Sequence, residues 1–329
     1  MSERPVPDEH GVVEARPDRG GGAATPSFAL PAEAGSGIPG VPDPVAIGPR
    51  TFYWGARTYL MGILNVTPDS FSGDGLLAAG DPVAAAVNQA SRMVDEGADL
   101  LDIGGASSRP GHDPIAPEEE VRRVVPVVEA LAATLPGTVL SVDTTSPAVA
   151  EAALDAGAHL LNDVWGVADD PGMIRVAAER GVPIVLMHNR GEARYGNLLG
   201  EVVADLQRAI DRALDAGVRW DHLVIDPGFG FGKTPDHNLA LLNGLGALTI
   251  LGRPILLGTS RKSTLGKVLD LPADQRVEAT AATTALGIAA GVDIVRVHDV
   301  RPNARTARVA DAILRGWRPD GWPDGAAPA

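Results

Sequence analysis

The sequence has no cysteine, and this absence removes disulfide bonds, thiolate nucleophiles and cysteine metal ligands from consideration. A chain without cysteine fits a reducing compartment, so we expect a cytoplasmic protein. Positive charge is also scarce, because 28 Lys and Arg residues stand against 42 Asp and Glu residues, for a formal net charge of −14. Nucleic-acid binding needs a cationic surface, so we expect no nucleic-acid partner, and any anionic ligand needs a local basic pocket.

Long apolar runs are missing as well. No stretch approaches the roughly 20 residues that a membrane-spanning helix requires. The N-terminus mixes Glu3, Asp8 and Glu9 with prolines instead of placing an apolar segment after a basic one. We therefore expect a soluble protein with no membrane partner and no targeting segment. The seven histidines are isolated and form no HExxH pair, so a structural metalloprotein is not expected.

Composition divides the chain into a central domain and two tails. Residues 1–45 are rich in Pro, Gly and Ala without apolar periodicity, so they cannot bury enough surface to offset the entropy of ordering. We expect them to form a disordered tail. Residues 318–329 have a similar composition and are expected to form a flexible tail. Residues 46–317 are then one domain with a full apolar core.

Within this domain, short β-branched apolar runs alternate with longer amphipathic segments, a pattern typical of βα units around a parallel sheet. Helices are expected at 82–96, 117–134, 147–156 and 199–216, and several end in a glycine, as helix C-termini do. Eight strands are expected, at 59–66, 99–104, 138–143, 159–164, 183–188, 222–226, 254–258 and 293–298.

Eight consecutive βα units predict an α/β fold of the TIM-barrel type, a (β/α)₈ barrel. A doubly wound sheet is the alternative, but no GxGxxG fingerprint follows Val66. An N-terminal β-hairpin, pairing 51–54 with 57–59 through a turn at Gly55 and Ala56, is expected to plug the base of the barrel.

Polar residues stand at the ends of nearly all the predicted strands. In a TIM barrel these ends form the active-site face, so the side chains are expected to converge on one pocket. For any single Asp or Asn, a helix cap or a turn is the more common explanation, but eight strands sharing the pattern favour a site. The residues concerned are Asn65, Asp102, Asp143, Asn162, Asp163, His188, Asp226, Ser260, Arg261, Lys262, Arg296 and His298.

The residue types indicate a ligand with two unlike ends. Asp143, Asn162 and Asp226 offer the donors and acceptors that a flat nitrogen heterocycle requires, including bidentate contacts to a carboxylate. Positive charge for an anion comes from Arg109, Lys262, Arg296 and His298. The pocket is therefore predicted to bind a heterocycle at one end and a phosphate at the other.

Two glycine-rich loops accompany these residues. The segment 227–233, PGFGFGK, lacks the spacing of a phosphate-binding P-loop. Its glycines allow either a close approach of backbone to ligand, with Phe229 or Phe231 as an aromatic wall, or simply a tight turn. The segment 67–75 follows the first strand, and its length suggests a mobile lid.

These motifs resemble those of the dihydropteroate synthase family. The similarity covers residues 50–316, and the motifs occur in the family's order, which makes the resemblance specific. The matching segments are NVTPDSFS (65–72), DIGG (102–105), SSRPG (107–111), SVDT (141–144), NDV (162–164), MH (187–188), DPGFGFGK (226–233), SRK (260–262) and RVHD (296–299).

The resemblance implies that pterin pyrophosphate condenses with p-aminobenzoate on a (β/α)₈ barrel, with Mg²⁺ as cofactor. It implies that the pterin ring is bound by Asp143, Asn162, Asp226 and Lys262, with Met187 packed nearby. Asn65, Arg296 and His298 then hold the pyrophosphate, and Asn65 contacts the Mg²⁺.

The same resemblance assigns the second substrate and the assembly. Ser108 and Arg109 belong to a mobile loop that closes over the site. The p-aminobenzoate pocket is shaped by that loop together with Pro110, Phe231 and Ser263. A homodimer through helices near residues 277–290 is also implied.

Two positions depart from the family pattern. Ala106 stands where the motif usually has Glu, and the first loop reads SGDG at 72–75 instead of SDGG, so Asp74 is expected to act for the shifted aspartate. Two alternatives to the synthase remain. One is a methyltetrahydrofolate-binding methyltransferase domain, which needs no pyrophosphate site and is therefore disfavoured by the cationic set of Arg109, Lys262, Arg296 and His298. The other is a pterin-binding homologue without turnover.

Overall fold

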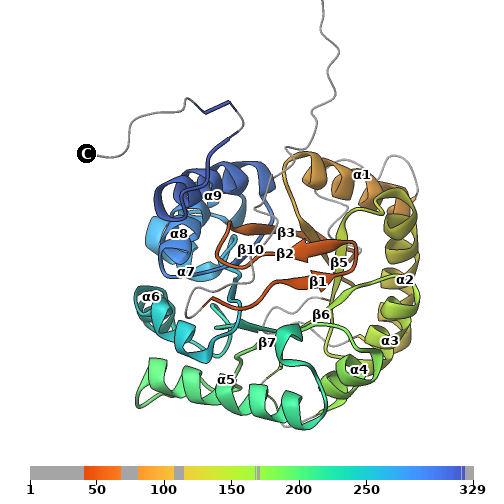
Figure 1. The fold of residues 1–329 in the computed structure, drawn as a ribbon, viewed down its shortest axis with the longest axis horizontal. Helices are drawn as coiled ribbons and strands as arrows, with labels where there is room; N and C mark the ends of the chain where they lie inside the picture. The colour runs from red at the N-terminus through yellow and green to blue at the C-terminus, as the bar shows by residue number, and fades with distance from the viewer. Residues whose placement is uncertain are drawn as a thin grey trace, which may run out of the picture. The chain divides into compact units, whose positions relative to one another are not determined.

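The computed structural model describes residues 41–67, 81–106, 115–166, 168, 171–319 and 321–322. The helices and strands of these ranges lie in the compact unit of residues 34–318. Helices form a ring around a central set of strands, as Figure 1 shows. No helix in the described ranges is both long and apolar enough to cross a membrane.

The described strands include eight parallel ones, and each lies at a predicted position. They pair in the order β8-β7-β6-β5-β4-β3-β10-β9, and a parallel bridge between Ile225 and Ile255 joins β8 to the segment before β9. The sheet therefore closes into the predicted (β/α)₈ barrel. Its strands are β3 (Tyr59–Asn65), β4 (Leu100–Gly104), β5 (Val139–Asp143), β6 (Leu160–Asp163), β7 (Ile184–Met187), β8 (Leu223–Asp226), β9 (Leu256–Leu257) and β10 (Ile294–Val297).

The helices begin and end where local sequence signals place them. Pro82 starts α1 behind Asp81, whose carboxylate accepts the Val83 N–H at 2.9 Å. Gly97 and Gly157 follow α1 and α3 with φ of 109° and 111°, which suits glycine. The helices are α1 (Pro82–Asp95), α2 (Pro117–Thr134), α3 (Pro147–Asp155), α4 (Gly172–Arg180), α5 (Leu198–Asp215), α6 (Pro235–Asn243), α7 (Ser263–Leu269), α8 (Val277–Ala289) and α9 (Val300–Leu314), with short 3₁₀ turns at η3 (Trp220–His222), η4 (Leu245–Leu251) and η5 (Ala273–Gln275).

Side chains alternate between two cores along each strand, because successive residues of a strand face opposite sides. Leu101, Leu140 and Leu161 pack outward against the helices. Their neighbours Leu100 and Val139 belong to a separate buried cluster inside the barrel. This inner cluster fills only the amino-terminal half of the barrel.

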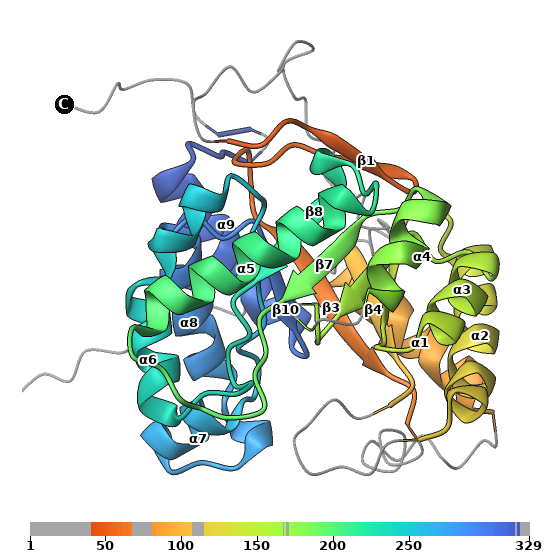
Figure 2. The same cartoon turned by 90° about the horizontal axis from the view of Figure 1, so that it is seen from below.

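A β-hairpin does cover the base of the barrel, but the predicted position of the hairpin was wrong. It pairs β1 (Val45–Ile47) with β2 (Arg50–Phe52) through a turn in which Gly48 has φ of 51°. The turn signal at Gly55 and Ala56 is real, yet it links β2 to β3, which do not pair. Figure 2 shows β1 lying across one end of the barrel.

The hairpin plugs the barrel with apolar side chains. Val45, Ile47 and Phe52 belong to the inner cluster, and the Phe52 ring lies 4.6 Å from the Tyr59 ring, centroid to centroid. Phe52 is fully buried. The base is therefore closed, and only the carboxyl ends of the strands are left for a ligand.

We expect Phe52→Ala to lower the free energy of unfolding by about 3 to 5 kcal/mol, because it leaves a cavity between the hairpin and the barrel. Urea unfolding followed by circular dichroism measures this change. The matched control is Ile250→Ala, since Ile250 is 80% exposed and its loss should cost less than about 0.5 kcal/mol. Equal losses in the two variants would show that the hairpin does not seal the core.

Candidate active site

The inner face of the barrel changes from apolar to polar toward the carboxyl ends of the strands. Two residues beyond Leu100 and Val139 of the inner cluster stand Asp102 and Ser141, which are register partners on β4 and β5. Two further on, Gly104 pairs with Asp143. Because alternate residues share a face, these side chains point into the same space.

Arg296 on β10 is held between two carboxylates inside the barrel. Its Nε donates to Asp102 Oδ2 at 2.5 Å, and its Nη2 donates to Asp143 Oδ2 at 2.5 Å. Asp102 Oδ2 also accepts from the Asn162 side-chain amide at 2.9 Å. Asp102 is fully buried, so it orients both the guanidinium and the amide from below. Arg296 is therefore an interior residue of the barrel and not a surface cation.

Two polar atoms at this depth have no hydrogen-bond partner among the described residues. They are Asp102 Oδ1 and Ser141 Oγ, both buried and on neighbouring strands. Buried polar groups normally bond to protein, water or ligand. The floor of the pocket therefore has unused bonding capacity. The sequence predicts Asp102 at the pocket without a role, and Ser141 has no predicted role because a small serine in a strand carries no distinctive signal.

A second charged pair lies on the neighbouring side of the barrel, at β8 and the segment after β9. Burial raises the pKa of Asp226, against the attraction of Lys262. Burial lowers the pKa of Lys262 to about 8, and Asp226 opposes that shift. Lys262 Nζ donates to the Phe229 carbonyl and lies 4.3 Å from the centroid of the Phe231 ring. Phe231 thus stands beside the charged pair as a wall.

Burial also raises the pKa of Asp143, to about 7, although the Arg296 guanidinium attracts its ionised form. Carboxylates with such a raised pKa are concentrated at functional sites. Asn65 lies beside it, because a Cβ added at Gly104 would stand 3.9 Å from Asn65 Oδ1 and 3.6 Å from Asp143 Cβ. The lack of a side chain at Gly104 keeps this space open.

The remaining described site residues surround this space. Met187 is buried and pairs in register with Asp226. His298 is anchored by Ser260, whose Oγ accepts the His298 backbone N–H at 3.1 Å and lies 3.0 Å from Nδ1. Ser263 opens α7 and is exposed. Asp74, Ser108, Arg109 and Pro110 lie outside the described residues.

Three of the residues predicted to converge on the pocket do not face it. Asp163 accepts the Trp165 backbone N–H at 2.9 Å, which is the turn role that is common for a single Asp. Arg261 forms an ion pair with Asp299 at 2.6 Å. His188 follows Met187 and points to the opposite side of β7, toward α5. Alternation along the chain explains Asp163 and His188, because each follows an inward-facing residue, whereas Arg261 lies in a turn beyond β9 with φ of 57°.

The glycine-rich segment 227–233 is a tight turn packed against neighbouring backbone. Gly228 and Gly232 have φ of 68° and 55°. A Cβ at Gly228 would lie 1.7 Å from the His188 carbonyl oxygen, and one at Gly232 would lie 2.4 Å from that of Arg190. Of the two interpretations left open by the sequence, these contacts favour the tight turn.

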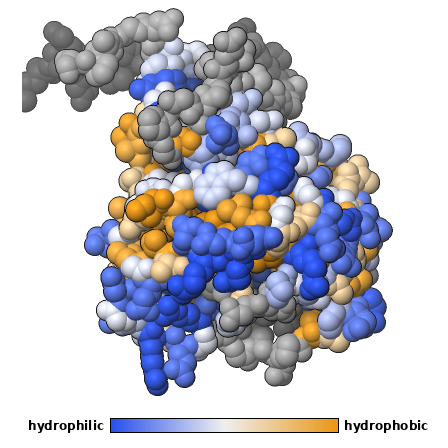
Figure 3. Space-filling model, turned by 60° about the horizontal axis from the view of Figure 1, so that its bottom comes forward, coloured by the Kyte–Doolittle hydropathy of each residue, from blue (hydrophilic) through white to orange (hydrophobic). Residues whose placement is uncertain are grey.

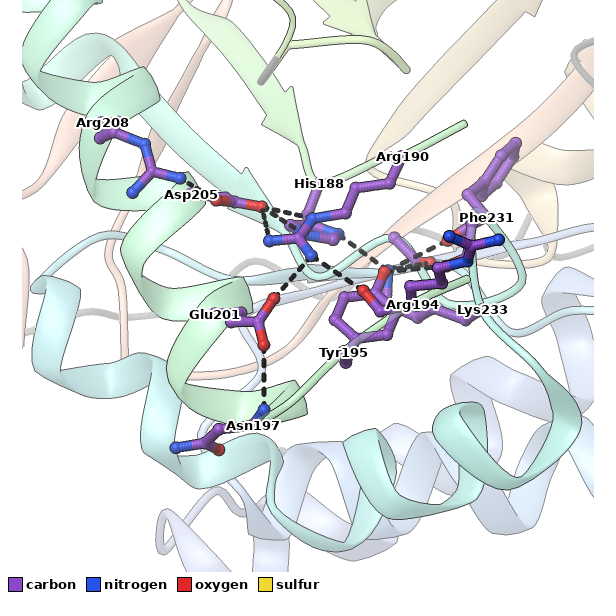
Figure 4. A network of polar contacts seen from close by, with 12 residues as sticks. His188, Arg190, Arg194, Tyr195, Asn197, Glu201, Asp205, Arg208, Phe231 and Lys233 are labelled. Atoms are coloured by element: carbon purple, nitrogen blue, oxygen red, sulfur yellow. Dashed lines mark hydrogen bonds and ion pairs between the residues drawn. The ribbon is translucent and has the colours of Figure 1, made fainter. Parts of the chain in front are cut away.

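His188 is the centre of a polar network behind this loop, drawn in Figure 4. Its Nε2 lies 3.1 Å from Asp205 Oδ2, and Lys233 Nζ lies 2.9 Å from its Nδ1. An ammonium has only donors, so Nδ1 accepts and Nε2 carries the proton given to Asp205. Burial lowers the pKa of His188 to about 4, and the Lys233 charge adds to this effect.

This lowered pKa predicts a loss of stability in acid. Below an ordinary histidine pKa of about 6.5, the unfolded chain binds a proton that folded His188 excludes down to about pH 4. The free energy of unfolding should therefore fall by roughly 3 kcal/mol over this range on account of His188. Urea unfolding of wild type and His188→Asn at several pH values measures the contribution. Parallel pH dependences for the two proteins would contradict it.

The fold and the pocket together define a (β/α)₈ enzyme with a site for a polar heterocycle, and comparison with known proteins agrees. The family of pterin binding enzymes matches residues 61–298. A dihydropteroate synthase of Clostridium beijerinckii is 48% identical over 270 residues, which cover 82% of this chain and 99% of that protein. The enzyme of Bacillus subtilis is 48% identical over 266 residues, covering 81% and 92%.

Solved structures give the same result. The dihydropteroate synthase of Clostridium difficile, determined in the presence of pteroic acid, superposes with a TM-score of 0.77 at 46% identity, covering 80% of this chain and 99% of that one. The Xanthomonas albilineans enzyme in complex with 7,8-dihydropteroate superposes with a TM-score of 0.73 at 41% identity, covering 80% and 96%. The chain belongs to the dihydropteroate synthase family of pterin-binding enzymes.

Proposed function

We propose that this chain condenses 6-hydroxymethyl-7,8-dihydropterin pyrophosphate with p-aminobenzoate, giving 7,8-dihydropteroate and pyrophosphate in folate biosynthesis. The observation that carries the proposal is the inward convergence of Asp143 on β5, Asn162 on β6 and Asp226 on β8, with Lys262 beside them. The relatives named above are dihydropteroate synthases by name, and of the similar solved structures one was determined in the presence of pteroic acid and another in complex with 7,8-dihydropteroate.

The ring end of the substrate would bind at the buried carboxylates. A pterin presents a row of N–H donors and ring acceptors along its edges. Asp226 and Asp143 would accept the N–H groups, while Asn162 and Lys262 would donate to the ring oxygen and nitrogen. Burial strengthens these bonds because water cannot compete for them. Met187 would cover one side of the ring.

The pyrophosphate end would lie above Arg296, near Asn65 and His298. Mg²⁺ usually takes one or two protein ligands and completes its shell with phosphate oxygens and water. The Asn65 amide oxygen beside the space left by Gly104 fits that requirement as a single protein ligand. Bound there, the ion would neutralise negative charge on the leaving group.

The reaction needs no protein nucleophile. The arylamine nitrogen gives its lone pair to the pterin methylene carbon, the bond from that carbon to the pyrophosphate oxygen breaks, and the nitrogen loses a proton. Arg296 and His298 would act as cationic and N–H donors toward the departing pyrophosphate. Phe231 and Ser263 would form the described part of the p-aminobenzoate pocket. Asp74, Ser108 and Arg109 would complete the site from the loops. We also propose that the protein is cytoplasmic.

The decisive experiment is pyrophosphate release by the purified protein. We expect release only when pterin pyrophosphate, p-aminobenzoate and Mg²⁺ are all supplied, with stoichiometric formation of dihydropteroate. A protein that binds pterin but releases nothing would be the homologue without turnover. Transfer of a methyl group from methyltetrahydrofolate would instead favour the methyltransferase alternative.

Asp226→Asn should weaken pterin binding by about 1.5 to 3 kcal/mol, the range for a hydrogen bond to a charged group. The reason is that the amide keeps the shape of the carboxylate but loses its charge and one acceptor. Isothermal calorimetry with a pterin lacking the pyrophosphate measures the change. Unchanged affinity in a folded variant would remove Asp226 from the ring site.

The assembly we propose is a homodimer through α8 and α9. A groove between these helices is lined mostly by apolar residues, including Ala285, Val309 and Ile313, together with Arg305 and Thr306. Val309 and Ile313 are 62% and 76% exposed. Figure 3 shows one face of the molecule, on which hydrophobic patches are bordered by hydrophilic residues. An exposed apolar groove of this kind is typical of a protein interface.

Ile313→Asp should convert the dimer to a monomer, because a charge in the interface would lose its hydration. Sedimentation equilibrium gives the mass directly. Leu214→Asp on α5 is the control, since Leu214 is also exposed but lies on another helix. A monomeric wild-type protein would contradict the proposed dimer.

A further inference from the structure

The loop at 227–233 is held in shape by side chains that bond to its carbonyl groups. Lys233 Nζ donates to the carbonyl oxygens of Gly228 and Phe231, at 3.0 and 3.1 Å. The Tyr195 hydroxyl donates to the Gly232 carbonyl at 2.8 Å. The turn is too short for a regular ladder of backbone hydrogen bonds, so the side chains of Lys233, at the end of the loop, and Tyr195, from outside it, define its conformation.

Lys233 is the centre of this arrangement, because all three N–H groups of its ammonium have an acceptor. Two are the loop carbonyls, and the third is Nδ1 of His188 at 2.9 Å. His188 in turn donates to Asp205, which also accepts from Arg190 Nε at 2.8 Å. A continuous chain of hydrogen bonds therefore links the loop to α5 on the outside of the barrel, as Figure 4 shows.

The loop transmits its shape to the proposed substrate site. The Gly228 N–H donates to Asp226 Oδ1 at 2.6 Å, which fixes the carboxylate on β8. The Phe231 N–H donates to the Gly228 carbonyl at 3.1 Å, and the Phe231 ring stands 4.3 Å from Lys262 Nζ. A shift of the two carbonyls that Lys233 binds would therefore move the aromatic wall and loosen Asp226.

We propose that Lys233 is a positioning residue, which with His188 and Asp205 behind it sets the loop so that Phe231 and Asp226 meet the two substrates. Lys233 acts from behind the loop and does not contact the reacting atoms. This inference rests on the proposed function, since Phe231 and Asp226 gain their roles from it. Burial lowers the pKa of Lys233 to about 7, so holding an ammonium here costs free energy, which its three hydrogen-bond acceptors offset.

Lys233→Met tests the proposal, because methionine keeps the length of the side chain and removes all three donors. We expect the KM for p-aminobenzoate to rise on the order of tenfold, since a displacement of about 1 Å can cost that much or more. Lys267→Met is the matched control, because Lys267 is exposed on α7 and should leave kinetics unchanged.

Two variants of His188 test whether the hydrogen-bonded residues Lys233, His188 and Asp205 act as a unit. His188→Leu removes the acceptor that faces Lys233 and should change KM in the same direction as Lys233→Met. His188→Asn retains an oxygen near the position of Nδ1 and should restore part of the loss. The double variant Lys233→Met/His188→Leu should be far less damaging than the product of the two single effects, as expected for coupled residues.

Hydrogen–deuterium exchange of the amides at 228–232 provides a readout that needs no substrate. Exchange there should accelerate in Lys233→Met and stay at the wild-type rate in Lys267→Met. A folded Lys233→Met with wild-type KM and wild-type exchange would overturn the positioning role. A lower melting temperature with unchanged KM would likewise reduce Lys233 to a structural residue. An inactive wild-type protein would instead contradict the proposed function, and exchange alone would then decide whether Lys233 sets the loop.

Discussion

The pocket depends on one buried arrangement of charges, the Arg296 guanidinium between Asp102 and Asp143. Removing a cation and two carboxylates from water costs several kcal/mol per ion, and only close, well-directed bonds offset that cost. Both bonds from Arg296 measure 2.5 Å, and Asp102 also orients Asn162. Without the cation, two carboxylates would face each other in an apolar barrel. The charge of Arg296 therefore allows two carboxylates to be buried together inside the barrel, and the polar pocket depends on it.

The rest of the barrel isolates this arrangement from the opposite end. The inner cluster under the polar layer is apolar, and the hairpin of β1 and β2 closes it with Phe52 and Ile47. An apolar base excludes water and keeps the local dielectric low, which strengthens each polar contact above it. Stability is thus concentrated at the amino-terminal ends of the strands and chemistry at their carboxyl ends, as the TIM-barrel fold generally requires.

The glycine-rich loop shows how one segment serves packing and chemistry together. Its glycines are required because His188 and Arg190 lie against its backbone, so their purpose is structural. The same turn presents Phe231 to Lys262 and an N–H group to Asp226. Contacts on the α5 side of the loop therefore set its conformation, and the groups that face the substrate pocket depend on that conformation. Packing on one side of the loop thus fixes its shape, although the loop is not part of a sheet or helix, and leaves its other side free to contact the site.

The sequence alone predicted the architecture, which the structure confirms, and it supplied the hypothesis for which residues bind the ring end of the substrate. Short apolar β-branched runs and glycine helix ends are local properties, so the eight strands could be placed, and family motifs pointed to Asp143, Asn162, Asp226 and Lys262. Charge and motif also favoured a pterin and a phosphate over other ligands. Local signals misplaced the hairpin, because a turn at Gly55 and Ala56 does not reveal whether its flanking segments pair.

Only the tertiary structure decided how the polar residues are partnered. Arg296 meets Asp102 from 194 positions away in the chain, and no local pattern encodes such a contact. Met187 and His188 point in opposite directions because they lie on opposite faces of the same extended segment. Closure of the whole sheet decides which of these faces meets the barrel interior. In the sequence, Lys233 only ends a glycine-rich segment that lacks the spacing of a P-loop. Its bonds to two carbonyls and His188 exist only once β7, β8 and α5 are packed together, because their geometry is a property of the assembled fold.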